Sequence, residues 1–245
     1  MRSCYTKLPR IVAALLTCML FAILTDCSST HTTPPPVLVV SSGSGQSTTV
    51  GTAFSAPLVA LVTVNGKPSV GVSVIFTVTS SLPGCTFANE TNTETVTTDS
   101  NGMATSSVCT ADTASGAYVV AATTLPAAGA DFSLSNTSGP PAAIAATSGT
   151  PQSATVSTAF ANPLVATVTD VDGNPVSGAS VTFTAPALGA SGTFANGTNT
   201  ETDTTDANGD ATSSTFTANA TAGSYSVTAT VPGVATPAVF SLTNN

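Results

Sequence analysis

The stretch TFANETNTETVTTDSNGMATSS, residues 86–107, recurs as TFANGTNTETDTTDANGDATSS, residues 193–214, and the two copies differ at 4 of 22 positions. The match continues outward on both sides. Three further segments correspond: FSAPLVALVTV at 54–64 with FANPLVATVTD at 160–170, GKPSVGVSVIFTV at 66–78 with GNPVSGASVTFTA at 173–185, and DFSLSN at 131–136 with VFSLTN at 239–244. Each repeat is therefore long enough to be a complete domain with its own core.

The composition favours strands. Hydrophobic residues make up 42% of the chain and charged residues 7%, and the apolar share is mostly Val and Ala among many Thr and Ser. Such residues suit a pleated, half-buried surface better than a helix. A chain this apolar also buries enough surface to fold, which excludes disorder.

Apolar residues alternate with polar ones at a period of two within each repeat. Val72, Val74, Phe76 and Val78 share one face, with Ser73 and Thr77 opposite, and residues 164–169 and 179–185 repeat the pattern. Turn signals separate these runs: Asn65-Gly66, Asn101-Gly102, Asp172-Gly173 and Asn208-Gly209. We predict an all-β protein of two tandem immunoglobulin-like antiparallel sandwiches, with seven to nine short strands each. A small barrel is the alternative fold.

The aromatic residues repeat as well, which predicts core positions rather than a binding stripe. Of the nine phenylalanines beyond residue 26, eight form matched pairs: Phe54 with Phe160, Phe76 with Phe183, Phe87 with Phe194, and Phe132 with Phe240. Tyr118 and Tyr225 also correspond. We expect each tyrosine to bury its ring and bond its hydroxyl.

Two cysteines, Cys85 and Cys109, lie in the first repeat, and Gly192 and Phe216 occupy their places in the second. The joint loss of both cysteines predicts that they form a disulfide. Closing a loop of about 25 residues would contribute roughly 3.5 kcal/mol in the chain-entropy model. Burying a large side chain such as Phe216 contributes a comparable amount, on the order of 3 kcal/mol.

Residues 1–26 are typical of a secretion signal, because Arg2, Lys7 and Arg10 precede the apolar run 11–24. That run is shorter than the roughly 20 residues of a membrane-spanning helix. The signal ends in Leu-Thr-Asp before Cys27, which resembles a lipobox with Asp in place of a small residue. Cys27 is thus a candidate lipidation site, with ordinary cleavage nearby or a retained anchor as alternatives.

These patterns predict the domain organisation of an exported cell-envelope protein. After the signal we expect a Ser/Thr/Pro tether at 27–36, one sandwich at 37–138, a linker at 139–141 and a second sandwich at 142–245. We expect the protein in the periplasm or on the cell surface, held to the membrane by its N-terminus.

The charge beyond Cys27 limits the partners. One lysine, Lys67, stands against eleven carboxylates, a net charge of −10. Nucleic acid and anionic lipid head groups are bound by clusters of Lys and Arg, so neither is an expected partner. The expected partner is an envelope or host surface protein or a glycan.

Catalytic residues are scarce, so we predict that the chain is not an enzyme. His31 in the tether is the one histidine, and a Ser-His-Asp or Cys-His set cannot be assembled on a folded domain. We expect no cofactor, apart from a calcium alternative. Its candidate ligands are Asp170, Asp172, Asp206 and Asp210, although their spacing is not that of an EF-hand loop and Asp also favours turns by itself.

The repeated motifs resemble a known family. NGKPSVGVSVIF or GNPVSGASVTF, then TDSNGMATSS or TDANGDATSS, then AGSYSVTAT are similar to the bacterial immunoglobulin-like group 1 (Big-1) domains of intimins and invasins, over about residues 37–245. The resemblance implies the sandwich fold and a spacer or adhesion role. No stretch resembles the terminal lectin-like domain of those proteins, so we do not expect their host-receptor binding. A specific glycan- or envelope-protein-binding module is the alternative function.

Overall fold

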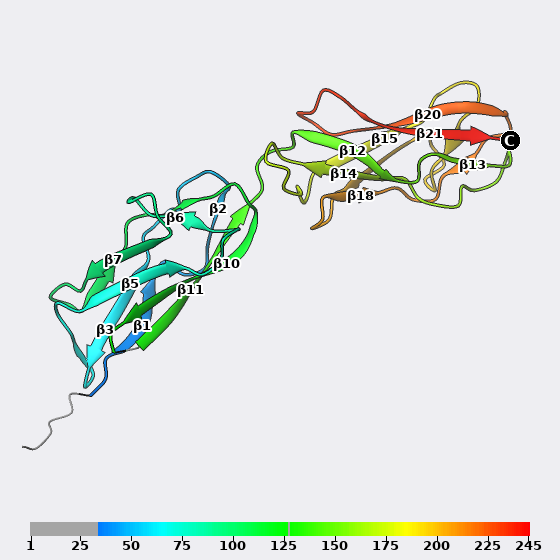
Figure 1. Ribbon diagram of the computed structural model, residues 1–245. Helices are drawn as coiled ribbons and strands as arrows, with labels where there is room; N and C mark the ends of the chain where they lie inside the picture. The colour runs from blue at the N-terminus through cyan, green and yellow to red at the C-terminus, as the bar shows by residue number, and fades with distance from the viewer. Residues whose placement is uncertain (1–33, 127) are drawn as a thin grey trace, which may run out of the picture. The chain divides into compact units, whose positions relative to one another are not determined.

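A computed structural model describes residues 34–126 and 128–245, and every regular element in these residues is a β-strand. The predicted signal, Cys27 and His31 lie outside the described residues. The strands form two sandwiches, each with its own hydrophobic core (Figure 1).

The first sandwich pairs a small sheet with a five-stranded one. Strand β3 lies between β1 on one side and β4 and β8 on the other, and the larger sheet has the order β2-β11-β10-β5-β7. Strand β2 runs parallel to β11, and the other pairs are antiparallel. The strands are β1 (Val37–Ser42), β2 (Gln46–Thr49), β3 (Val59–Val64), β4 (Lys67–Pro68), β5 (Ser73–Val78), β6 (Cys85–Thr86), β7 (Thr93–Thr97), β8 (Met103–Thr105), β9 (Thr110–Ala111), β10 (Gly116–Thr124) and β11 (Ala128–Thr137).

The second sandwich repeats this arrangement with sheets β12-β14-β18 and β13-β21-β20-β15-β17. Its strands are β12 (Ala143–Ser148), β13 (Gln152–Ala154), β14 (Val165–Thr169), β15 (Ser180–Thr184), β16 (Gly192–Thr193), β17 (Thr200–Thr204), β18 (Asp210–Thr212), β19 (Thr217–Ala218), β20 (Gly223–Thr230) and β21 (Ala238–Asn244). The strand total exceeds the prediction of seven to nine per repeat because short ladders such as β6-β9 and β16-β19 add two-residue strands.

The predicted alternation places the core. In β5, Val74, Phe76 and Val78 are buried, whereas Ser73 and Ile75 are exposed. The ring of Phe76 lies 6.4 Å from that of Phe87 and 5.8 Å from that of Phe132, between centroids. The same three rings recur in the second sandwich, where Phe183 lies 6.3 Å from Phe194 and 5.9 Å from Phe240. Ala60 and Val62 of β3 in the small sheet and Phe76 of β5 in the large sheet belong to one buried cluster. The two sheets thus enclose one core, so the predicted sandwich is confirmed and the barrel alternative is wrong.

Buried hydroxyls connect strands at matched positions. Ser106 accepts a hydrogen bond from the Leu58 backbone N–H at 3.0 Å, and Ser213 accepts one from Leu164 at the same distance. Thr98 accepts from the backbone of Val72 in the first sandwich. Buried backbone groups outside the ladders thus find partners, which avoids the cost of an unpaired buried donor.

The Asn-Gly and Asp-Gly turns occur where the sequence predicted them. Asn65 and Gly66 both have positive φ angles, 54° and 72°, as a two-residue hairpin turn requires. Gly209 has a φ of 78°, and a Cβ there would lie 2.5 Å from the Val168 carbonyl oxygen. Glycine at 209 is therefore required both by backbone conformation and by close approach.

The Gly209→Ala substitution should destabilise the second sandwich more than Gly173→Ala does. Gly173 also has a positive φ, 86°, but a Cβ there would meet nothing within 4 Å, so only the conformational cost of roughly 1–2 kcal/mol applies. Differential scanning calorimetry of both variants measures the difference. Equal losses of melting temperature would show that the contact with Val168 carries no energy.

Candidate functional surfaces

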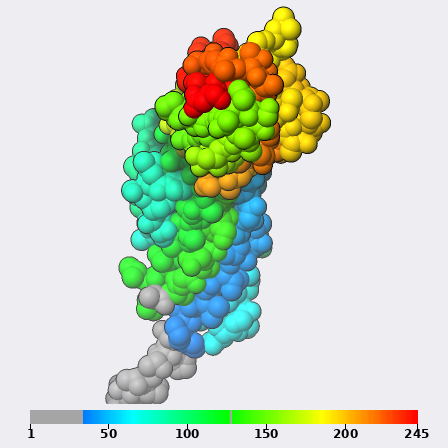
Figure 2. Space-filling view, turned by 90° about the vertical axis from the view of Figure 1, so that its right-hand side faces the viewer, coloured from blue at the N-terminus to red at the C-terminus, as the bar shows by residue number. Residues whose placement is uncertain are grey.

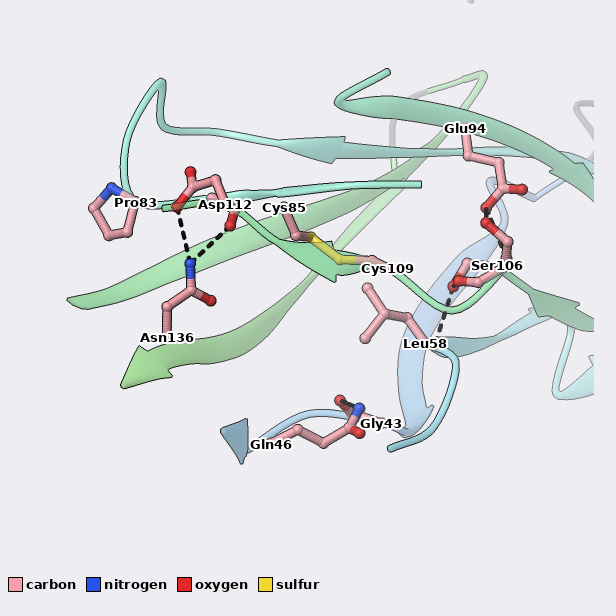
Figure 3. Close-up of a disulfide and its surroundings, with 12 residues drawn as sticks. Gly43, Gln46, Leu58, Pro83, Cys85, Glu94, Ser106, Cys109, Asp112 and Asn136 are labelled. Atoms are coloured by element: carbon pink, nitrogen blue, oxygen red, sulfur yellow. Dashed lines mark hydrogen bonds between the residues drawn. A yellow bond between two sulfur atoms is a disulfide. The ribbon is translucent and has the colours of Figure 1, made fainter. Parts of the chain in front are cut away.

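The predicted disulfide is present at one end of the first sandwich. Cys85 in β6 is bonded to Cys109, which precedes β9, with a Cα–Cα distance of 5.8 Å, and both cysteines are 3% exposed (Figure 3). The backbone N–H of Phe54 donates to the Cys109 carbonyl at 3.0 Å. The disulfide thus ties the β6-β9 ladder to the core, in a place that solvent does not reach. This burial supports a structural rather than a redox role.

In the second sandwich the ring of Phe216 occupies the matched place. Phe216 is 1% exposed, and its ring centroid lies 4.7 Å from that of Phe194 and 5.7 Å from that of Phe160. A Cβ on Gly192 would lie 2.7 Å from the Cζ atom of Phe216. The ring therefore fits only because residue 192 has no side chain, which is the physical reason that both cysteines are replaced together.

A buried amide lies next to the disulfide. The Asn136 Nδ2 donates to the Gly84 carbonyl at 2.8 Å and to Asp112 Oδ1 at 3.1 Å (Figure 3). Asn244 makes the corresponding bonds in the second sandwich, with Asn219 in place of Asp112. This amide joins the last strand to the loop beside the disulfide, so its role is structural.

The two tyrosines differ, although their positions match. Tyr225 donates its hydroxyl to Asn244 Oδ1 at 3.0 Å, as predicted. For Tyr118 that prediction is wrong, because neither its hydroxyl nor Asn136 Oδ1 finds a partner among the described residues. Burial raises the pKa of Tyr225 to about 12, whereas burial and the nearby Asp112 carboxylate raise that of Tyr118 further. The sequence signal for the larger pKa shift of Tyr118 is Asp112, which stands where the second sandwich has Asn219.

The calcium candidate Asp170 is buried, 3% exposed. Its Oδ1 accepts from the backbone N–H groups of Asp172 and Asn174, and its Oδ2 accepts from Gly139 of the linker. Burial opposes ionisation, but these bonds and the one from the Asn174 side chain outweigh it and lower the pKa of Asp170. Both carboxylate oxygens of Asp170 therefore already accept hydrogen bonds from the turn and the linker.

Of the other calcium candidates, Asp172 and Asp206 are exposed at turns, and Asp210 is half-buried at the start of β18. Asp206 accepts from the backbone N–H groups of Asn208 and Asp210, and these bonds lower its pKa. Asp210 instead accepts a bond from the Thr167 hydroxyl. Within the residues that the structure describes, no three His, Cys, Asp or Glu side chains form a group that could hold a metal ion. The calcium alternative stays untested by this arrangement, and turn formation accounts for the Asp170 and Asp206 carboxylates.

Calcium is expected to leave the melting temperature unchanged. A carboxylate such as Asp170 would have to release backbone N–H groups to bind a cation, which costs the bonds just described. Calorimetry with millimolar calcium and with a chelator makes the comparison, with magnesium as the control. A rise in melting temperature confined to calcium, and lost in Asp170→Asn, would establish the site instead.

A shallow trough lies on the five-stranded sheet of the second sandwich. Its volume is about 570 Å³, and hydroxyl and amide side chains from β13, β20 and β21 line it, including Gln152, Ser226 and Ser241. Figure 2 shows the region, where the red C-terminal residues lie beside the green start of the second sandwich. The described lining has no carboxylate, lysine or histidine. The trough can therefore form hydrogen bonds with a neutral polar ligand.

No helix long and apolar enough to cross a membrane occurs in residues 34–126 or 128–245. A scan against protein-family models gave no match. A search of curated proteins gave none either.

Solved structures do match. The D0-D1 domain of intimin is 25% identical, with 86% of this chain and 99% of that chain covered and a TM-score of 0.34. InvD of Yersinia pseudotuberculosis is 19% identical, with 86% and 57% covered and a TM-score of 0.53. Invasin, described as a bacterial integrin-binding protein, is 23% identical, with 86% and 39% covered and a TM-score of 0.34. The chain spans 57% of InvD, and that match shows a shared fold.

Reduction of the disulfide should destabilise the first sandwich alone. The cysteines are 24 residues apart in sequence, which corresponds to roughly 3.5 kcal/mol of loop-closure entropy. The matched change in the second sandwich is Phe216→Ala, which should cost about 3–5 kcal/mol. Calorimetry with and without a reductant reports both transitions, and the Cys85→Ala/Cys109→Ala variant assigns them. Movement of the Phe216-dependent transition on reduction would contradict separate cores.

Proposed function

We propose that this chain is a non-catalytic cell-envelope protein whose tandem immunoglobulin-like sandwiches act as a spacer and adhesion module. The sandwiches hold surfaces away from the membrane, and the N-terminal segment, with Cys27 as the lipidation candidate, attaches them to it. The repeated self-contained core is the observation that carries this proposal. Two sandwiches of the same fold suit a module that bears load and presents surfaces. Each is stabilised at the same place, by a disulfide in the first and by the Phe216 ring in the second.

The structural neighbours and the sequence motifs support the same proposal. Intimin and invasin are among the matches, and InvD shares the fold. The partner that invasin binds is a property of that protein, and the similarity assigns no integrin to this chain. Its own partner would contact the neutral hydroxyl-rich faces of the sheets, since one lysine against eleven carboxylates disfavours anionic partners.

A protease-site insertion tests display. The loop around Leu188 is highly exposed, with Leu188 at 89%, so it should tolerate a recognition sequence for a site-specific protease. Added to intact cells, the protease should cut this variant, as it cuts it in permeabilised cells. Cleavage only after permeabilisation would place the module in the periplasm and remove the display proposal. Mass spectrometry of the Cys27 peptide reports lipidation separately.

A specific glycan-binding module is the second candidate, and the trough favours it. The serine and threonine hydroxyls that line the trough are the chemistry that neutral sugars bind. A glycan array of the purified chain should then give saturable binding, and filling the trough with Ser226→Tyr should abolish it. The Val119→Tyr variant, at the matched position of the first sandwich, is the control. Absence of binding in the wild-type chain would leave the spacer proposal alone.

A further inference from the structure

The chain contains four asparagines that are each followed by glycine: Asn65-Gly66, Asn101-Gly102, Asn196-Gly197 and Asn208-Gly209. Such a pair is chemically labile, because the backbone nitrogen of the glycine can attack the side-chain carbonyl carbon of the asparagine and displace its amide. Glycine has no side chain that would shield this nitrogen. Since all four pairs share this chemistry, the fold decides which of them reacts.

Two of the pairs are protected because their glycines are buried. Gly102 and Gly209 both lie inside the protein. The Gly102 N–H donates to the Asp99 carbonyl at 3.0 Å, so its nitrogen is engaged in a hydrogen bond. The Gly209 N–H likewise donates to the Asp206 carbonyl at 3.1 Å. The amide of Asn208 is held as well, because its Nδ2 donates to Asp206 at 3.3 Å.

The third pair is exposed but held by hydrogen bonds. Asn196 and Gly197 are both exposed, and the Gly197 N–H donates to the Phe194 carbonyl at 2.9 Å. The Asn196 Nδ2 donates to the Thr200 carbonyl at 2.9 Å. Its Oδ1 accepts from the backbone N–H of Thr198 at 2.8 Å. These bonds must break before the Asn196 amide can turn toward the Gly197 nitrogen.

The fourth pair is exposed and unrestrained. Asn65 and Gly66 form the two-residue turn between β3 and β4, where Val64 pairs with Lys67. Among the residues that the structure describes, the Gly66 N–H has no acceptor and the Asn65 side chain has no hydrogen-bond partner. A Cβ on Gly66 would meet nothing within 4 Å, so the turn has room for the Asn65 amide to move.

We propose that Asn65 is the site at which the folded chain deamidates. The Gly66 nitrogen forms a bond to the Asn65 Cγ atom, and the bond from Cγ to Nδ2 breaks. The amide group takes up the proton that the Gly66 nitrogen loses and leaves as ammonia, so that a succinimide ring remains. Water then adds to one of the two ring carbonyls and opens the ring to aspartate or isoaspartate. No oxidant or reductant takes part.

The reaction changes both the charge and the backbone of one hairpin. It places a carboxylate two residues before Lys67, the single lysine or arginine beyond Cys27. The second sandwich already has Asp172 before the matched Gly173, so the aspartate product is compatible with this turn. In isoaspartate the main chain gains a methylene group, which does not fit a two-residue turn. The isoaspartate product should therefore loosen the pairing of β3 with β4.

Isotope labelling of the folded protein tests this assignment. The purified full chain is kept in a mildly alkaline buffer made with heavy-oxygen water, so that each asparagine that deamidates takes up the label. Peptide mass spectrometry then reads all four sites. We expect several times more label at Asn65 than at Asn196, the matched control in which both residues of the pair are also exposed. In urea, which removes the hydrogen bonds of the fold, the four sites should label at similar rates.

Label at Asn65 no greater than at Asn196 in the folded chain would overturn the proposal. An excess at Asn65 that persists in urea would overturn it too, because the local sequence and not the fold would then select the site. Gly66→Ala is a second check: the new Cβ meets nothing, so the chain should fold, while its methyl group shields the nitrogen and lowers labelling of Asn65 several-fold. Unchanged labelling in that variant would exclude attack by the nitrogen of residue 66. These outcomes do not depend on where the module is displayed.

Discussion

The packing of three buried phenylalanine rings in the core is the contact on which the rest of each sandwich depends. Phe76 in the first sandwich and Phe183 in the second each meet two further rings at centroid distances of 5.8–6.4 Å. In the first sandwich the rings come from β5, from β11 and from the segment after β6, so their burial holds segments far apart in the sequence in one core. Each ring contributes about 1.5–3 kcal/mol by burial and fixes the depth of the core.

One end of this core is closed in two chemically different ways. A disulfide joins Cys85 and Cys109 in the first sandwich, and the Phe216 ring over Gly192 fills the same place in the second. The two solutions act differently: the covalent bond restricts the unfolded chain, whereas the ring adds apolar contact in the folded state. Buried amides beside them, Asn136 and Asn244, donate to the backbone carbonyl at the matched position in both cases, Gly84 and Ser191.

The fold could be predicted because the sequence contains two copies of the same domain-length repeat. Matched phenylalanines, alternating Val and Thr, and Asn-Gly turns identified the core faces, and the joint loss of both cysteines identified the disulfide. Features that depend on register could not be predicted. Val39, Leu61 and Met103 become neighbours only through the alignment of three strands. Asp170 is buried by its local turn, and periodicity does not record that the Tyr118 hydroxyl has no hydrogen-bond partner among the described residues.

Both sandwiches share one fold, in which the disulfide of the first and the Phe216 ring of the second are interchangeable. The most direct measurement is the unfolding free energy of the Cys85→Gly/Cys109→Phe variant, which transfers the closing contact of the second sandwich to the first. We expect the first sandwich of this variant to fold, with an unfolding free energy within about 1–2 kcal/mol of the wild type. The reason is that burial of the new ring replaces a loop-closure entropy of similar size. A loss as large as that of the Cys85→Ala/Cys109→Ala variant would contradict it.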